Sequence, residues 1–331
     1  MIFTQSKTFA DTEASNENAQ RLEVFNNAKF SIGVSGWISS GETHMELKST
    51  VDEITSFAGF VGQNQAGDKV SDLLWEDVDS NIVQFDAEVT LSNKFFLYAD
   101  VGIGSIEDLK LTDDDFLGSL NGNTRVELSH TVNGGSADDL SYVNIHLGRE
   151  IIRSQDGKSK LRGFLGYQHW NEKLVSSLPV SECTQAFVDC VSSTNLAFSG
   201  DFITYDYSFN SIKLGLDGEF SLFNKFKVFG AFSYLPLASL DAEDFHHLRD
   251  DAASPFVNWD GDGDGYNLDV GVNYEVFSGW KLSAGYRYWK ISSDKNDTTF
   301  HFADGTDLSD GREIDFDVDR SGFTLGLNYI F

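Results

Sequence analysis

Basic residues are scarce in this sequence. It holds 24 lysines and arginines against 52 aspartates and glutamates, so its formal net charge is −28. Such a charge repels a phosphate backbone, and we therefore expect no nucleic-acid partner. It suits a cationic partner instead, or a divalent metal that bridges to other anions.

Proline is also scarce, with 3 residues in 331, whereas glycine numbers 30 and aromatic residues make up 14% of the chain. Aromatic residues favour strands, and disordered acidic chains contain few of them. The composition therefore favours a β protein over a disordered acidic chain.

Long hydrophobic runs are absent. No stretch has the length of a transmembrane helix, and the mean hydropathy is −0.26. Residues 1–20 show no basic region followed by an apolar one, so they do not predict a signal peptide. Two interpretations remain at this point: a cytoplasmic protein, or a mature exported protein to which Met1 has been added.

Cysteine occurs only at Cys183 and Cys190, within a polar segment. Their spacing would close a small disulfide loop in an oxidising compartment. Two free thiols are the alternative, and the spacing alone does not decide between them.

Alternation of apolar and polar residues is the main pattern present. It recurs in the segments 30–35, 83–90, 97–104, 143–147, 212–217, 268–275 and 322–331. Successive side chains of a strand point to opposite faces, so each segment predicts a strand with one apolar face. Alternation does not show which face meets water.

The connections between these segments decide that question. Tight turns at 92–94, 155–157, 223–225 and 278–279 alternate with long polar stretches, roughly 50–69, 105–139, 175–200, 247–264 and 293–312. Short turns at one end and long loops at the other are typical of an outer-membrane barrel, and aromatic residues at the strand ends fit its interfacial girdles.

We therefore predict an all-β fold: a ten-stranded antiparallel up-and-down transmembrane β-barrel with short periplasmic turns and long extracellular loops. The predicted strands are about 29–49, 70–91, 95–108, 139–153, 161–175, 201–221, 226–246, 264–277, 280–293 and 312–331. Residues 29–331 form this single barrel, and residues 1–28 form a polar lead-in. Strands longer than the ~9–11 residues that cross the bilayer should project above it. A barrel of this size has room for side chains but scarcely for a channel, which disfavours a pore.

One strand end carries groups suited to catalysis. If 226–246 is one strand, Asp244 and His246 share a face, and a carboxylate can orient an imidazole as a general base. Asp113 and Asp115 should emerge at the same end of the barrel. Two close carboxylates do not both ionise easily, so this pair can hold a water or act as an acid. The alternative is an acidic loop in a very acidic protein.

At these residues the chain resembles the omptins, a family of outer-membrane endoproteases. The segments that carry the resemblance are, in chain order, Ser31-Ile32-Gly33, Ser40-Gly41, Lys69-Val70-Ser71-Asp72-Leu73-Leu74-Trp75, Asp113-x-Asp115-Phe116, Ser129-His130, Gly166-Tyr167-Gln168 and Asp244-Phe245-His246. Together they cover most of the chain at low similarity.

The resemblance implies a hydrolase, an aspartyl-type endopeptidase of the cell surface that needs no cofactor for its chemistry. His246, oriented by Asp244, would activate a water that Asp113 and Asp115 help to position against the peptide carbonyl. Cationic peptides or proteins would be the substrates, and lipopolysaccharide of the bacterial outer membrane would be an activator. The protein would be a monomer with its active site facing the cell exterior.

The chain departs from the omptin pattern at the positions where omptins bind substrate and lipopolysaccharide. Typical omptins have acidic residues where this chain has Met45 and Ala242, although an acidic residue adjoins each of them. The candidates to bind substrate are Met45, Glu46, Asp241 and His130. Where omptins have charged residues that grip lipopolysaccharide, this chain has His169 and Asn171.

A glycine-rich acidic segment, Asp260-Gly261-Asp262-Gly263-Asp264-Gly265, resembles the start of a calcium-binding loop. Position 12 of that pattern would be Gly271 rather than glutamate, and a strand rather than a helix should begin here, which excludes an EF-hand. Asp260, Asp262 and Asp264 could still bind Ca²⁺ loosely, and an ordinary acidic turn is the alternative.

The scattered histidines show no ligand spacing, so we expect no zinc site.

The leading hypothesis is thus an omptin-like endopeptidase. The alternative is a non-catalytic surface adhesin or binding barrel on the same scaffold, because a fold does not guarantee an activity. A small pore ranks third.

Overall fold

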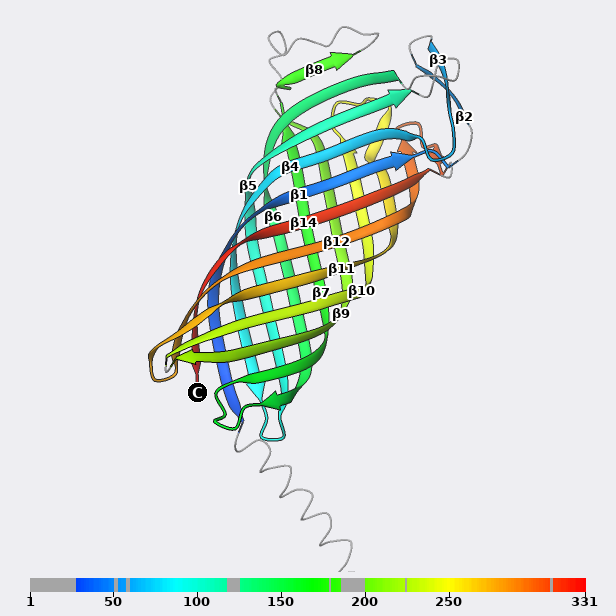
Figure 1. The fold of residues 1–331 in the computed structure, drawn as a ribbon. Helices are drawn as coiled ribbons and strands as arrows, with labels where there is room; N and C mark the ends of the chain where they lie inside the picture. The colour runs from blue at the N-terminus through cyan, green and yellow to red at the C-terminus, as the bar shows by residue number, and fades with distance from the viewer. Residues whose placement is uncertain are drawn as a thin grey trace, which may run out of the picture.

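Ten long antiparallel strands close into one barrel (Figure 1). The computed structural model describes residues 28–50, 53–57, 60–117, 126–178, 180–185, 200–223, 225–309 and 312–331. The barrel strands are β1 (Lys29–Lys48), β4 (Lys69–Thr90), β5 (Phe95–Leu117), β6 (Val126–Arg153), β7 (Lys160–Ser177), β9 (Asp201–Phe223), β10 (Phe226–His246), β11 (Ala252–Phe277), β12 (Trp280–Phe302) and β14 (Glu313–Ile330). Each pairs with the next along the chain, and β14 pairs with β1 to close the ring. The predicted fold is therefore confirmed.

Within the described part of the chain, four short strands lie outside this ring. They are β2 (Glu53–Phe57), β3 (Phe60–Asn64), β8 (Glu182–Gln185) and β13 (Asp307–Leu308). β2 and β3 form a separate hairpin, β8 pairs with β6, and β13 pairs with β12. Figure 1 shows β2, β3 and β8 at the end of the barrel opposite to the C-terminus. No helix in the described residues is long and apolar enough to cross a membrane.

The two ends of the barrel differ. At the turn end, which holds the C-terminus, neighbouring strands are joined by tight turns, and Gly279 takes a positive φ of 82° in the turn between β11 and β12. Such a backbone conformation favours glycine because it has no Cβ. The opposite end, where β1 ends at Lys48 and β10 ends at His246, is called the rim below.

An apolar belt surrounds the half of the barrel nearer the turn end. On β1 and β14 its last members are Ile38 and Phe323, which pair with each other and are 69% and 73% exposed. Large exposed apolar side chains facing outward are expected where a barrel meets lipid. Nearer the rim, the outward positions of β1 are polar, among them Glu42 and His44. The strands therefore continue beyond the belt, as their predicted length required.

The interior is packed midway along the barrel. The rings of Trp37, Tyr142 and Trp170, from three different strands, lie 5.1, 4.8 and 5.5 Å from that of Trp289 on β12. All four side chains are buried. Because they meet across the lumen, the described interior is divided into a cavity near the rim and another near the turn end, which have no lining residue in common.

A buried ion pair joins opposite walls next to this aromatic layer. Arg320 of β14 donates from Nε to Glu172 Oε1 of β7 at 3.1 Å, and both side chains have no exposed area. Arg320 also donates to Thr43 Oγ1 at 2.9 Å, and Tyr207 donates to Glu172. The charges are buried but compensated, which is the condition under which such pairs are tolerated.

Strand lengths were underestimated from the sequence. Four strands extend much further toward the rim than predicted, and the additional strand segments are 109–117, 126–138, 252–263 and 294–302. The reason is that above the apolar belt the apolar residues face the lumen, and polar residues such as Asp113 and Asp115 interrupt that face, so the alternation is broken there. The predicted lead-in, residues 1–28, lies almost wholly outside the described residues.

Candidate active site

The end of β10 places two functional groups on the inner face. Asp244 and His246 both line the cavity at the rim, and His246 Nε2 lies 2.9 Å from Asp244 Oδ2. The Asp244 side chain is only 3% exposed, whereas that of His246 is 22% exposed. His247 turns away from the cavity and lies 2.9 Å from Thr204 Oγ1 through Nε2. Strand alternation thus places the two histidines on opposite faces of β10.

A second pair of carboxylates lines the same cavity from β5. This strand continues to Leu117, so Asp113 and Asp115 both point inward. Ser129 Oγ of β6 donates to Asp115 Oδ2 at 2.9 Å. Asp114, between them, turns outward and bonds to His130. The predicted Asp pair and the Asp–His pair therefore share one cavity, which they enter from strands separated by β6, β7 and β9.

The charges of these groups influence one another. Burial, together with the neighbouring Asp115 carboxylate, raises the pKa of Asp113 well above its usual value, and Asp244 adds to the effect. His246 is subject to opposing effects: burial lowers its pKa, but the charge and hydrogen bond of Asp244 outweigh burial, so the pKa is raised. Asp113 therefore holds a proton more readily than an ordinary carboxyl group does, and His246 is more basic than an ordinary imidazole.

Several buried polar atoms at this site have no hydrogen-bond partner within the described residues, and three of them are Asp244 Oδ1, Tyr205 Oη and Thr131 Oγ1. Burial and the charges of Asp244, Asp113 and Asp115 raise the pKa of Tyr205 well above its usual value. Buried polar atoms are normally satisfied by a protein group, a water or a ligand. These atoms are suited to hold a small polar species between the two pairs.

Tyr205 is a residue that the sequence reasoning missed. It lies on β9, pairs in register with Asp244, and has no exposed area. The signal was present in the alternating residues Ile203, Tyr205, Tyr207 and Phe209, all of which are buried. Only the pairing between β9 and β10 shows which of them lies beside the carboxylate.

The cavity itself has a volume of about 500 Å³ and is largely apolar. Its lining residues are Met45, Leu47, Val70, Ser71, Leu73, Asp113, Asp115, Ser129, Thr131, Phe202, Ile203, Asp244, His246, Leu248, Arg249, Phe256, Val257, Trp259, Phe300, Phe302, Leu308, Arg312 and Ile314. The ring of Phe256 stands edge-on to His246 with centroids 5.1 Å apart, so it shields one side of the imidazole. This apolar lining was not predicted.

Three of the four predicted substrate-binding residues lie elsewhere. Met45 lines the cavity, but Glu46 points to the outer face, where its carboxylate bonds to Lys48 and Lys69. Asp241 is exposed on the outer face of β10, and His130 bonds to the outward Asp114. The structure therefore does not bring Glu46, Asp241 and His130 into the cavity, because neighbours along a strand point to opposite faces. An acidic residue next to Met45 or Ala242 therefore cannot take the place of an inward-facing carboxylate at that position.

The segment considered as a possible calcium loop forms part of a strand. Asp260, Asp262 and Asp264 belong to β11 and are all exposed, so they follow one another along the outer face of an extended strand. A calcium site needs oxygens that converge on one point, which a straight strand does not supply. The glycines between them instead allow close packing, since a Cβ at Gly263 would lie 2.0 Å from the Ser292 carbonyl oxygen.

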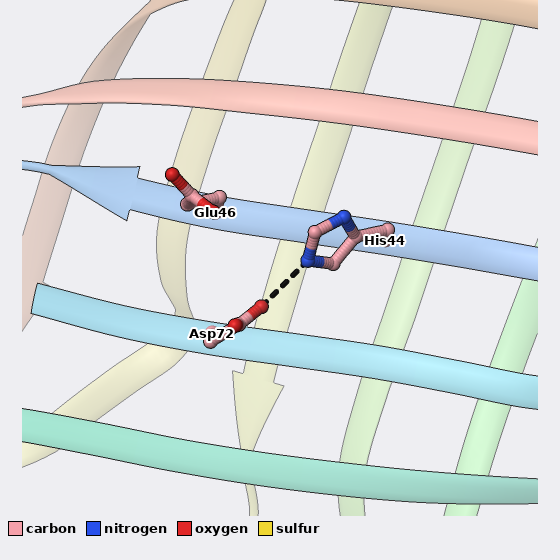
Figure 2. Close-up of side chains that lie close together, drawn as sticks. All are labelled: His44, Glu46 and Asp72. Atoms are coloured by element: carbon pink, nitrogen blue, oxygen red, sulfur yellow. Dashed lines mark hydrogen bonds and ion pairs between the residues drawn. The ribbon is translucent and has the colours of Figure 1, made fainter. Parts of the chain in front are cut away.

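Two other clusters in the described residues bring three metal-ligating groups together. One consists of Asp114, Glu127 and His130, and the other of His44, Glu46 and Asp72. Figure 2 shows the second cluster on the outer face of β1 and β4, with His44 Nε2 2.6 Å from Asp72 Oδ1. Lys69 bonds to both of its carboxylates, so their charge is already compensated by an internal cation.

The remaining predictions concern the cysteines and the lipid. Cys183 of β8 is disulfide-bonded, whereas Cys190 lies outside the described residues, so their pairing stays a prediction. His169 lies on the outer face of β7, where Nδ1 is 3.0 Å from Asn210 Oδ1. Contact between this surface and lipopolysaccharide stays a prediction as well.

Comparison with solved structures supports the fold. The outer membrane protease OmpT from Escherichia coli superposes with a TM-score of 0.68 at 16% sequence identity, over 92% of this chain and 97% of that chain. A Pseudomonas aeruginosa FadL homologue (TM-score 0.30, 8% identity, 92% and 90% coverage) is much less similar. The same holds for the translocator domain of autotransporter NalP from Neisseria meningitidis (TM-score 0.36, 9% identity, 98% and 99% coverage). At these identities the likeness to OmpT concerns the fold alone.

Comparison of sequences identifies the family. No curated protein matches the chain. The family model described as "Pom: Protochlamydia outer membrane protein" matches residues 51–329, which is most of the barrel. The ten-stranded fold and its apolar belt agree with a place in the outer membrane. The chain therefore belongs to the Protochlamydia outer membrane protein family.

Proposed function

We propose that this protein is an omptin-like endopeptidase of the outer membrane. The observation that carries the proposal is the convergence of Asp244–His246 and Asp113–Asp115 on one cavity at the rim. Hydrolysis by an activated water requires a base with an orienting carboxylate, and an acid that can hold a proton. His246 with Asp244 would supply the first, and the Asp113–Asp115 pair would supply the second.

Each residue has its own role in the proposed reaction. A water held by Asp113 and Asp115 attacks the peptide carbonyl carbon while His246 takes one of its protons. Asp244 orients the imidazole and stabilises its positive charge, and the proton retained by the Asp pair can be donated in a hydrogen bond to the developing oxyanion. When the C–N bond breaks, His246 gives its proton to the leaving amine. The residues of the chain perform every step, so no cofactor is required.

The surroundings of the site suggest its substrates. With the turn end in the periplasm, the rim faces the cell exterior, where it meets peptides and proteins from outside. The net charge of −28 would concentrate cationic peptides near the cavity and raise their rate of encounter. We propose that the barrel acts as a monomer and that lipopolysaccharide around the belt supports its activity.

Cleavage of cationic peptides by the refolded protein tests the proposal. The protein is incubated in detergent with and without lipopolysaccharide, and the products are identified by mass spectrometry. Cleavage is expected from the wild type and should be lost in His246→Ala, Asp244→Ala and Asp113→Ala. Full activity of these variants would remove the assigned residues from the mechanism. Tight binding of peptides without turnover would instead favour the non-catalytic binding barrel.

A further inference from the structure

The wall of the rim cavity is apolar over one continuous arc. Around the ring of strands, β11, β12, β14, β1 and β4 lie between His246 on β10 and Asp113 on β5. The inward side chains that these five strands contribute to the cavity include Phe256, Trp259, Phe300, Ile314, Met45 and Leu73. The two proposed catalytic pairs are thus connected by a largely hydrophobic surface, within which Ser71 and Arg312 are the polar lining residues of the described chain.

The acidic residues of the same five strands point away from the cavity. Glu46, Asp72 and Asp260 lie on the outer face, and the cavity lining of the described residues contains no carboxylate except those of Asp113, Asp115 and Asp244. The negative charge of the protein is therefore concentrated outside the cavity. An inserted ammonium or guanidinium group would have only the proposed catalytic carboxylates as counter-ions.

Two cations add to this effect. The guanidinium groups of Arg249 and Arg312 line the cavity and lie 4.3 and 5.4 Å from the ring centroids of Phe256 and Phe300. Arg249 also bonds to Asp251, which compensates its charge. Both guanidinium groups already occupy the positions against these aromatic rings that a substrate lysine or arginine would use.

We propose that the cavity selects a large apolar side chain, aromatic or long aliphatic, beside the bond that is cleaved. This inference rests on the proposed function. It implies that two different parts of the protein recognise the substrate. The acidic outer surface attracts a peptide whose overall charge is positive, while the cavity binds a hydrophobic residue within it. Burial of such a side chain is favourable, whereas burial of a cation without a spare carboxylate is costly. The substrate class is therefore cationic amphipathic peptides.

Peptides of equal length and equal positive charge, which differ only in one central residue, test this selectivity. Phenylalanine, leucine, lysine and arginine are compared at that position, and kcat/KM is measured with the wild-type protein. We expect cleavage beside phenylalanine or leucine to be about ten- to a hundredfold faster than beside lysine or arginine. Equal or faster cleavage beside the basic residues would overturn the inference and leave the proposed hydrolysis intact.

Binding to the His246→Ala variant separates the two proposals. Competition against a labelled peptide, followed by fluorescence anisotropy, should show the same preference for the phenylalanine peptide without any turnover. If the wild type cleaves nothing but this preference is seen, the hydrolytic function fails and the apolar cavity stands. If neither cleavage nor binding prefers the apolar residue, the assignment of the cavity is wrong.

Substitutions on β1 supply a matched control. Met45→Glu and Leu47→Glu each introduce a carboxylate into the cavity wall, and either change should shift the preference toward lysine and arginine by about tenfold or more. Glu46→Gln changes the intervening residue, which points outward, and should leave the preference unchanged. Heat-dependent mobility on gels shows whether each barrel has folded. A folded Met45→Glu or Leu47→Glu barrel with unaltered preference would contradict the proposal.

Discussion

Replacement of Asp244 by asparagine is the sharpest test of the proposed mechanism. Asparagine keeps the shape of the side chain and can still bond to His246, but it removes the negative charge 2.9 Å from the imidazole. In the wild type that charge outweighs burial and holds the pKa of His246 above the usual 6.5. In Asp244→Asn, burial is opposed only by more distant carboxylates such as Asp113, so the pKa of His246 should fall.

The size of the effect follows from the geometry. Two unit charges at 2.9 Å interact by about 6 kcal/mol at an effective dielectric constant of about 20, which is an upper bound on the stabilisation of the imidazolium in the transition state. General-base catalysis contributes about 10²–10⁴-fold, or about 3–5.5 kcal/mol. We therefore expect kcat/KM to fall by about 10²–10⁴-fold.

The pH dependence of kcat/KM measures the charge effect separately from the rate. His246 acts as a base only when it is neutral, so activity should rise as the pH increases through its pKa. This acid limb should lie above pH 6.5 for the wild type and should move to lower pH in Asp244→Asn. Asp241→Asn, which changes an exposed outward residue of the same strand, is the control. An acid limb that stays in place or moves to higher pH would refute the pairing of Asp244 with His246.

Three further predictions concern other parts of the barrel. His247→Ala should retain wild-type kcat/KM where His246→Ala loses it, because His247 bonds to Thr204 outside the cavity; equal losses would contradict the assigned register. Asp113→Asn should raise the thermal stability at neutral pH, since the raised pKa means that ionisation destabilises the folded state, and this gain should disappear below pH 3.8, where the carboxyl is protonated in both states. Arg320→Met should cost about 3–5 kcal/mol in urea unfolding by leaving Glu172 buried without its partner, and Glu172→Leu in the same chain should recover most of that loss. A double variant no more stable than Arg320→Met would show that the charge pair is not responsible.

Much of the fold could be predicted because strand patterns are local. Alternation through the belt identified seven of the ten barrel strands, and tight turns at one end established the up-and-down order. The same period of two placed Asp244 and His246 on one face, and His247 on the other. These features depend only on near neighbours along the chain, which the sequence contains in full.

Above the belt the sequence was less informative. There the apolar residues face the cavity and polar or glycine residues interrupt the alternation, so β11 was predicted to begin near residue 264, although it begins at Ala252. For the same reason the acidic residues of 260–264 were assigned to a loop rather than to a strand. Glu46 and Asp241 were chosen as substrate residues although one step along a strand reverses the direction of the side chain, and the structure places both outside the cavity.

The sequence by itself thus determined the class of fold, the order of the strands and the groups at each strand end. Only the tertiary structure decided what faces what across the lumen. The partnership of Arg320 with Glu172, the presence of the Asp113–Asp115 and Asp244–His246 pairs in one cavity, and the apolar wall between those pairs all arise when the sheet closes on itself. Closure sets these contacts through strand number, tilt and stagger, which are properties of the whole ring and of no single segment.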